Sequence, residues 1–166
     1  PIHIETVVDA ALDAVRPVAE DKGVRLVTRL DRDFPLFLAD PERLQQAVNN
    51  VLSNAVKFSP GDSTVEVELR REEEVAHIAV CDHGIGIRSE FLPYVFDRLR
   101  QGTSAGNHGL GLGLWIVGDI VERHGGSVAA TSDGEGKGAT FTMTLPLRAQ
   151  AESLNGGLRM AVSRSA

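Results

Sequence analysis

The stretch from Asp40 to Ser59 constrains the fold most, because it has the pattern of one helix with two distinct faces. Asp40 is suited to cap the N-terminus of this helix, and Pro41 fits its first turn. Apolar residues recur at helical spacing and form a stripe, which predicts the face that builds the core: Leu44, Val48, Val51, Leu52 and Ala55.

The second face of this helix is polar. Asn50, Asn54 and Lys57 stand at i, i+4 and i+7, so they share a face roughly 100° round the axis from the apolar stripe. Asparagine favours caps and turns over helix interiors, so two in register need a reason. The helix alone leaves two interpretations open: a solvated surface, or a wall of amides and a cation that binds a ligand.

The composition predicts one soluble globular domain. Of 166 residues, 42% are hydrophobic and 24% are charged, and the net charge of −6 argues against a nucleic-acid partner. The single cysteine, Cys81, lies in an apolar run and is interpreted as a core residue in a reducing cytoplasm. No apolar run is long enough to span a bilayer, which predicts no direct membrane insertion of this chain.

Apolar periodicity also predicts the order of the other elements. Residues 148–166 lack a sustained pattern, so we expect a domain at 1–147 followed by a disordered tail. Within the domain we expect further helices at 3–20 and 114–124, strands at 24–30, 64–71, 75–82, 127–132 and 139–145, an extended piece at 34–39 and a short helical segment at 93–99.

The third predicted strand ends at an acidic residue, and two glycines follow it. Asp82 ends this strand and is followed by Gly84 and Gly86, which let backbone approach a ligand closely. An ionised carboxylate only accepts hydrogen bonds, so it suits a ligand edge that donates, such as an exocyclic amine. The alternative is a tight turn closed by the aspartate side chain.

A second glycine-rich stretch, His108 to Gly113, precedes the helix predicted at 114–124. Free amides at a helix N-terminus preceded by glycines can bind phosphate oxygens. The stretch matches neither the Walker A nor the Rossmann pattern, and a glycine hinge against packed leucines is the alternative. Arg98 and Arg100, which lie between the two glycine motifs, either reach a terminal phosphate or solvate a surface segment.

In this order and spacing, the motifs resemble the ATP-binding catalytic domain of bacterial two-component sensor histidine kinases. The asparagine helix is similar to the family's N box, Asp82–Gly86 to its G1 box, Phe96–Leu99 to its F box and Gly109–Gly113 to its G2 box. The end of the predicted domain, 138–146, also resembles the family's closing strand. The resemblance implies the Bergerat ATP-binding fold, an α/β two-layer sandwich of a mixed β-sheet with helices on one face and a lid at about 97–110.

The resemblance also implies roles for single residues. Asp82, supported by Thr140, accepts the adenine amine, and Asn54 holds the Mg²⁺ that bridges the phosphates. Phe58 and Ile87 pack against the base. The residues implied to bind ATP–Mg are Asn50, Asn54, Lys57, Phe58, Asp82, Gly84, Gly86, Ile87, Arg98, His108, Gly109, Leu110, Gly111, Leu112, Gly113 and Thr140.

The implied function is the catalytic half of a cytoplasmic kinase that donates the γ-phosphate of ATP to a histidine on a separate dimerisation/phosphoacceptor domain. The implied partners are that domain and a response regulator receiver domain, within a homodimeric parent, with or without a membrane anchor. No phosphoacceptor motif surrounds His3, so the isolated chain is not expected to phosphorylate itself. Leu99 replaces a phenylalanine of the family's F box, which bears on how the lid docks.

Two alternative functions remain open at this point. A stand-alone ATPase or serine kinase of the same fold, as in the gyrase and Hsp90 relatives, carries a glutamate where Asn50 stands. A carboxylate there can act as general base and an amide cannot, so Asn50 favours the histidine-kinase branch. A nucleotide-binding regulator without catalysis is the other alternative, if Leu99 disables the lid.

Overall fold

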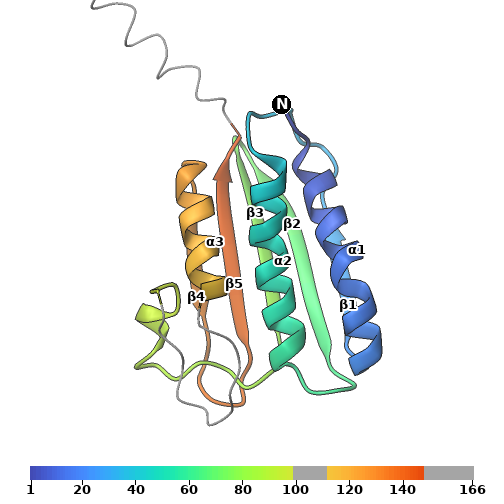
Figure 1. The fold of residues 1–166 in the computed structure, drawn as a ribbon, viewed down its shortest axis with the longest axis vertical. Coiled ribbons are helices and arrows are strands. Elements are labelled where there is room, and N and C mark those ends of the chain that lie inside the picture. Colours follow the sequence, from blue (N-terminus) through green and yellow to red (C-terminus); the bar gives the residue numbers. More distant parts are fainter. Residues whose placement is uncertain (99–111, 148–166) are drawn as a thin grey trace, which may run out of the picture.

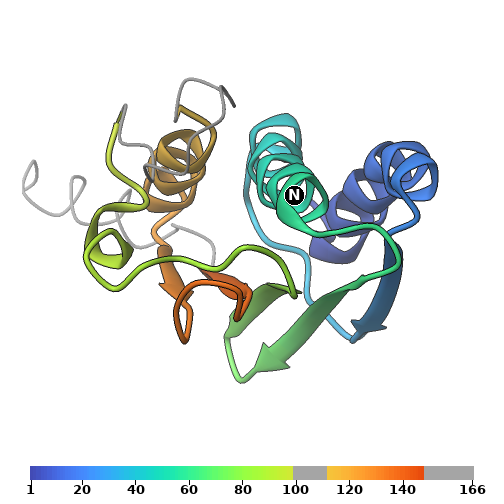
Figure 2. The same ribbon diagram turned by 90° about the horizontal axis from the view of Figure 1, so that it is seen from below.

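The computed structural model describes residues 1–98 and 112–147, which form a two-layer α/β sandwich (Figure 1). Viewed end-on, the three helices cover one face of a single sheet (Figure 2). The helices are α1 (Ile4–Lys22), α2 (Pro41–Phe58) and α3 (Leu112–Arg123), and a 3-10 turn, η1, spans Leu92–Tyr94. The strands are β1 (Arg25–Leu30), β2 (Thr64–Glu72), β3 (Val75–Asp82), β4 (Ser127–Thr131) and β5 (Ala139–Pro146). The predicted fold class is confirmed.

The five strands follow the order β1-β2-β3-β5-β4. Strands β1 and β2 are parallel and are connected through α2, whereas the other neighbours are antiparallel, so the sheet is mixed. Helix α2 lies between α1 and α3 (Figure 1). The central strand β3 ends at Asp82, below the C-terminal half of α2, which brings the polar residues of both elements to one end of the molecule.

The core lies between the helices and the inner face of the sheet. Alternate residues of β2, β3 and β5 point inward, and all five residues of the predicted α2 stripe are at most 1% exposed. Burying one such side chain contributes about 1.5–3 kcal/mol, so this stripe fixes which face of α2 remains for the polar residues. The apolar half of the prediction for this helix is confirmed.

Both ends of α2 are held by specific side chains. The carboxylate of Asp40 accepts a hydrogen bond from the Arg43 amide at 3.2 Å, which is the predicted N-cap. At the other end, the Lys22 ammonium donates to the carbonyl oxygens of Val56 and Lys57 at 2.9 and 2.6 Å. A cation at a helix C-terminus satisfies free carbonyls and opposes the helix dipole, so α1 stabilises the end of α2 that carries the polar face.

Three predicted elements differ from the structure. Segment 34–39 forms only an isolated bridge, in which Phe37 pairs with Ile2, because no further residue of the segment continues the ladder. Of the helical segment expected at 93–99, the described part up to residue 98 contains only the single turn Leu92–Tyr94. Helix α3 begins at Leu112, two residues earlier than predicted, and so includes Gly113.

Candidate functional site

Asp82 is the buried acidic residue at the end of β3, and it is only 5% exposed. Its Oδ1 accepts a hydrogen bond from the Gly84 amide at 2.9 Å, and the carboxylate also accepts one from the Ala139 amide. Burial raises the pKa of this carboxyl above its usual range, while the two amides partly offset that shift. A buried carboxylate without a salt bridge is costly, and such groups are common at functional sites.

The two glycines after Asp82 are required by neighbouring backbone. A Cβ at Gly84 would overlap the carbonyl group of Phe58 at the end of α2, and the Ile85 amide donates to that same carbonyl oxygen at 3.3 Å. Gly86 has φ of 69°, and a Cβ there would overlap the carbonyl oxygen of Gly134. Gly84 thus allows the end of α2, and Gly86 the β4–β5 loop, to approach closely, while the expected approach of a ligand to their backbone stays a prediction.

The loop between β4 and β5 is fastened to the loop that follows Asp82. The Gly136 amide donates to the Ile85 carbonyl oxygen at 2.7 Å, and the Gly138 amide donates to that of Gly84 at 3.2 Å. The hydroxyl of Ser132 accepts from the Ile87 amide at 3.0 Å. The sequence interpretation missed Ser132, because a serine before a glycine-rich turn carries no distinctive local pattern.

On the polar face of α2, the two asparagines have different surroundings. Asn50 is partly buried, and its Nδ2 donates to the carbonyl oxygen of Gly113 in α3 at 3.3 Å. Asn54 is also partly buried, and within residues 1–98 and 112–147 its side chain makes no hydrogen bond. Asn50 therefore ties α2 to the start of α3, and Asn54 differs from it in having no such bond among the described residues.

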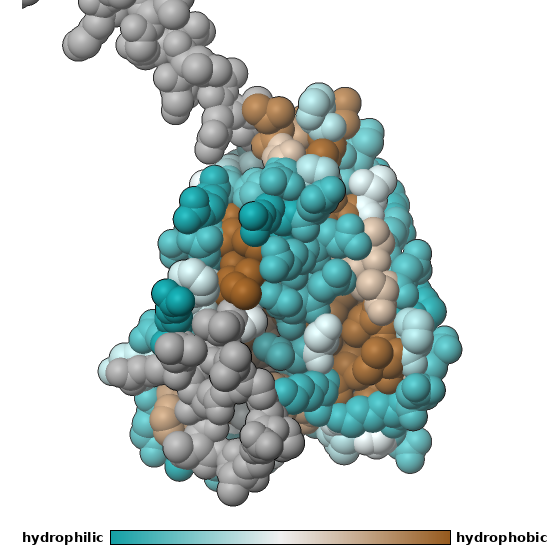
Figure 3. Space-filling model, in the orientation of Figure 1, coloured by the Kyte–Doolittle hydropathy of each residue, from teal (hydrophilic) through white to brown (hydrophobic). Residues whose placement is uncertain are grey.

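Lys57 lies on the outer side of this polar face. Its side chain is exposed, and its ammonium lies 5.3 Å from the ring centroid of Phe58, which is partly buried. Lys57 also borders a shallow groove between α1 and α2, where Val18 is 59% exposed; Figure 3 shows an apolar patch bordered by polar side chains in this region. Lys57 therefore lies beside Phe58 and the α1–α2 groove, and its place in a polar wall facing the phosphates stays a prediction.

The segment that resembles the F box packs against α3 and β5. The rings of Phe96 and Phe141 meet edge to face, with centroids 6.2 Å apart. A methyl group added at Gly118 of α3 would lie 3.9 Å from the Cβ of Phe96. The guanidinium of Arg98 lies over the Trp115 ring, 5.1 Å from its centroid, so this cation contacts α3 rather than the polar face of α2.

The strand register corrects two predictions. Asp82 pairs with Ala139 and Cys81 pairs with Thr140, and directly opposed residues share a face. Asp82 takes the inward position, so Thr140 and Cys81 lie on the outer face of the sheet, and both are partly exposed. The prediction that Thr140 supports Asp82 is wrong, as is the interpretation of Cys81 as a core residue. The Ala139 amide takes the supporting role.

Part of the predicted phosphate loop cannot be compared with the structure. His108, Gly109, Leu110 and Gly111 lie outside the described residues, as does most of the expected lid. Leu112 is the first residue of α3, and its side chain is not described. Only Gly113 of this group is placed, next to Asn50.

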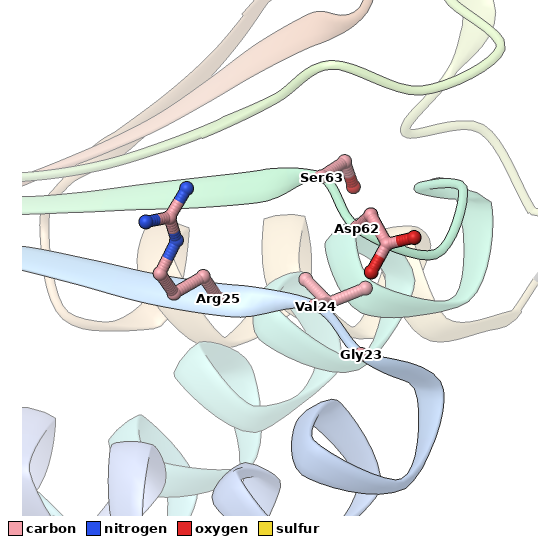
Figure 4. A pocket seen from close by; sticks show the side chains of 5 residues that line it. All are labelled: Gly23, Val24, Arg25, Asp62 and Ser63. Atoms are coloured by element: carbon pink, nitrogen blue, oxygen red, sulfur yellow. The ribbon is translucent and has the colours of Figure 1, made fainter.

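A separate hollow lies at the β1–β2 side of the sheet (Figure 4). It forms where the turn after α1 meets the turn before β2, since the Asp62 amide donates to the Gly23 carbonyl oxygen at 3.0 Å. It is lined by Gly23, Val24, Arg25, Asp62 and Ser63. None of the predicted nucleotide-binding residues contributes to this hollow.

The described residues contain neither a membrane-spanning helix nor a cluster of metal-binding side chains. Across 1–98 and 112–147, no helix is long and apolar enough to cross a membrane. In the same residues, no cluster of three or more His, Cys, Asp or Glu side chains is arranged to hold a metal ion.

Comparison with known proteins identifies the class. Residues 39–149 match the family described as Histidine kinase-, DNA gyrase B-, and HSP90-like ATPase. This match covers more than half of the chain and includes Asn50, Asn54, Asp82 and Gly113, so the chain belongs to this family.

Within the family, the similar proteins are sensor histidine kinases. The chain is 38% identical over 141 residues to the sensor histidine kinase WalK of Bacillus subtilis, covering 81% of this chain and 23% of WalK. It is 32% identical over 148 residues to the adaptive-response sensory kinase SasA of Synechococcus elongatus, covering 88% of this chain and 38% of SasA. The chain thus spans only part of the length of these curated relatives.

Solved structures agree with this assignment. The mycobacterial sensor histidine kinase MprB matches with a TM-score of 0.79 and 30% identity, over 89% of this chain and 97% of that chain. Full-length ShkA in complex with AMPPNP matches with a TM-score of 0.77 and 28% identity, over 88% of this chain and 30% of that chain. The fold is that of the catalytic domains of sensor histidine kinases.

Proposed function

We propose that this chain binds ATP–Mg and transfers the γ-phosphate of ATP to a histidine on a separate dimerisation/phosphoacceptor domain. The observation that carries the proposal is the buried acceptor, Asp82, at the same end of the molecule as the polar face of α2 and the start of α3. An adenine needs an acceptor for its amine, and a triphosphate needs amides and a helix N-terminus, so the two halves of the site suit the two halves of ATP.

The base end is formed by Asp82, Phe58 and Ile87. The ionised carboxylate accepts the hydrogen bond of the exocyclic amine, and burial strengthens that bond because little water competes. Phe58 and Ile87 are partly buried. The backbone of Phe58 contacts Gly84 and Ile85, which follow Asp82, and the Ile87 amide donates to Ser132. The apolar side chains of Phe58 and Ile87 flank the base.

The phosphate end is formed by Asn54 and the N-terminal turn of α3, which the Asn50–Gly113 hydrogen bond holds beside α2. Mg²⁺ retains waters and binds oxygen ligands, largely those of the nucleotide phosphates. The amide oxygen of Asn54, which has no hydrogen-bond partner within residues 1–98 and 112–147, suits such an ion. When bound, Mg²⁺ neutralises charge on the phosphates; the chain's own residues position them.

The chain's contribution to phosphoryl transfer is positioning. In this reaction the protein mainly orients the phosphates and stabilises charge. Asn50 cannot act as a general base, and its amide is already engaged with Gly113, which favours transfer to an imidazole over hydrolysis by water. The proposed partners are the phosphoacceptor domain and a response regulator receiver domain, in a homodimeric parent that places this domain in the cytoplasm.

Calorimetric titration of the full chain with ATP–Mg tests the site. We expect Asp82→Asn to weaken binding about tenfold to a hundredfold. The side-chain NH2 of the asparagine would face the exocyclic amine of adenine, and two donors form no hydrogen bond. Asp13→Asn is the matched control, since Asp13 is exposed on α1 and forms only a 3.7 Å pair with Arg16. Equal affinity for wild type and Asp82→Asn would overturn the assignment of the base end.

A further inference from the structure

The hydroxyl of Ser132 is where two loops of the site meet. Its oxygen accepts from the Ile87 amide at 3.0 Å and from the Gly134 amide at 3.3 Å. Its hydrogen is directed to the Gly138 carbonyl oxygen at 2.6 Å. One partly buried hydroxyl therefore uses both its acceptor and donor capacity to join loop 84–87 to loop 132–138.

A chain of hydrogen bonds connects the same hydroxyl to the carboxylate of Asp82. Ser132 bonds the Gly138 carbonyl oxygen, the Gly138 amide donates to the Gly84 carbonyl oxygen at 3.2 Å, and the Gly84 amide donates to Asp82 Oδ1 at 2.9 Å. Gly138 has φ of 70°, and a Cβ there would overlap the carbonyl oxygen of Asp82. Little room is left for these peptides to shift independently.

A second side-chain link between the two loops is weaker. Arg88 and Glu135 form an ion pair of 3.6 Å between exposed or half-exposed side chains. Such pairs contribute about 0–1 kcal/mol and are screened by salt. Removing the Ser132 hydroxyl instead deprives two amides and one carbonyl of a partner at a partly buried position, which is the more costly change.

We propose that Ser132 is a positioning residue for the adenine end of the site: it holds Ile87 directly, and Asp82 through Gly138 and Gly84, in the places that the base requires. This inference rests on the proposed nucleotide site. Within residues 1–98 and 112–147 the hydrogen bonds of Ser132 reach neither Asn54 nor the start of α3, so its effect is expected at the base end.

The test compares Ser132→Ala with Ser132→Thr, which keeps the hydroxyl, and with Ser63→Ala. Ser63 is the matched control, because its hydroxyl also bonds a loop carbonyl, that of Pro60, but outside the two loops. Affinities for ATP–Mg and GTP–Mg are measured on the full chain, with thermal melts to verify that each variant is folded. Amide exchange at Ile87 is measured by NMR.

We expect Ser132→Ala to weaken ATP–Mg binding at least about tenfold, to reduce the preference for ATP over GTP, and to speed exchange of the Ile87 amide. Ser132→Thr restores most of the affinity, and Ser63→Ala leaves it unchanged. Equal losses for ATP and GTP, or unchanged ATP affinity in folded Ser132→Ala, overturn the inference alone. Failure of the wild type to bind ATP overturns the proposed function and this inference together.

Discussion

The side chain of Asn50 in α2 donates a hydrogen bond of 3.3 Å to the carbonyl oxygen of Gly113 in the first turn of α3. These residues are 63 positions apart and belong to the two motifs that are proposed to bear on the phosphates. The bond gives an asparagine in a helix interior a partner, because its Nδ2 can donate to a lone pair of the Gly113 carbonyl oxygen, which has two. It also distinguishes Asn50 structurally from Asn54, although the sequence places both on one face.

Replacing Asn50 by aspartate removes this donor and places a carboxylate against a carbonyl oxygen. We expect Asn50→Asp to lose about 1–3 kcal/mol of stability, to weaken phosphotransfer and to gain ATP hydrolysis, because a carboxylate can act as a general base on water. Chemical denaturation measures the first effect, and phosphate release with transfer assays measures the others. Unchanged hydrolysis together with unchanged phosphotransfer would contradict the argument that the amide at position 50 favours transfer over hydrolysis.

Asp82→Asn should separate stability from binding. Among the described residues the buried carboxylate forms no salt bridge, so the neutral amide removes the cost of burying charge while its oxygen still accepts from the Gly84 amide. We expect the variant to be at least as stable as wild type at neutral pH. A large loss of stability, measured by urea denaturation, would mean that the charge itself holds the loop together.

The same carboxyl predicts a pH dependence with a definite sign. Its folded-state pKa lies above the unfolded value, so the folded state binds a proton more tightly over the interval between the two. The stability of wild type relative to Asp82→Asn should therefore fall as pH rises from about 4 through that interval. ATP affinity should change in the opposite direction, because only the ionised group is a pure acceptor. Thermal melts and titrations across this range check both trends.

Gly84 should tolerate no side chain. A Cβ there overlaps the carbonyl of Phe58, so we expect Gly84→Ala to cost about 2 kcal/mol or more, and to weaken nucleotide binding through displacement of Asp82 and Phe58. Gly118→Ala in α3 is the matched control, since the new methyl meets Phe96 and Val128 only at 3.9 Å. In a helix interior that change should stabilise by up to about 1 kcal/mol.

Helix α2 was predictable from sequence because its determinants are local. The apolar stripe, the Asp40 cap and Pro41 all act within one element, and the structure has each of them as expected. The order of the motifs then indicated the family, whose matched region begins at residue 39. Local pattern and motif order thus provided the helix, the fold class and the position of Asp82.

The remaining features depend on pairing between distant segments. Thr140 was assigned to Asp82 from the family resemblance, but the register of β3 and β5 turns it to the outer face. Lys22 and Ser132 act on backbone groups far along the chain, and nothing near either residue in sequence marks that role. A shift of one residue in register exchanges the faces of a strand, which periodicity alone does not resolve.

The central claim is tested most directly by transfer of the γ-phosphate. The full chain is incubated with γ-phosphate-labelled ATP and Mg²⁺, with and without a separately produced phosphoacceptor domain of the parent kinase. We predict that label enters the phosphoacceptor domain only when the chain is present, that Asp82→Asn reduces the transfer strongly, and that Asp13→Asn does not. ATP bound by the chain with no label entering the phosphoacceptor domain, or label entering the isolated chain itself, would contradict this account.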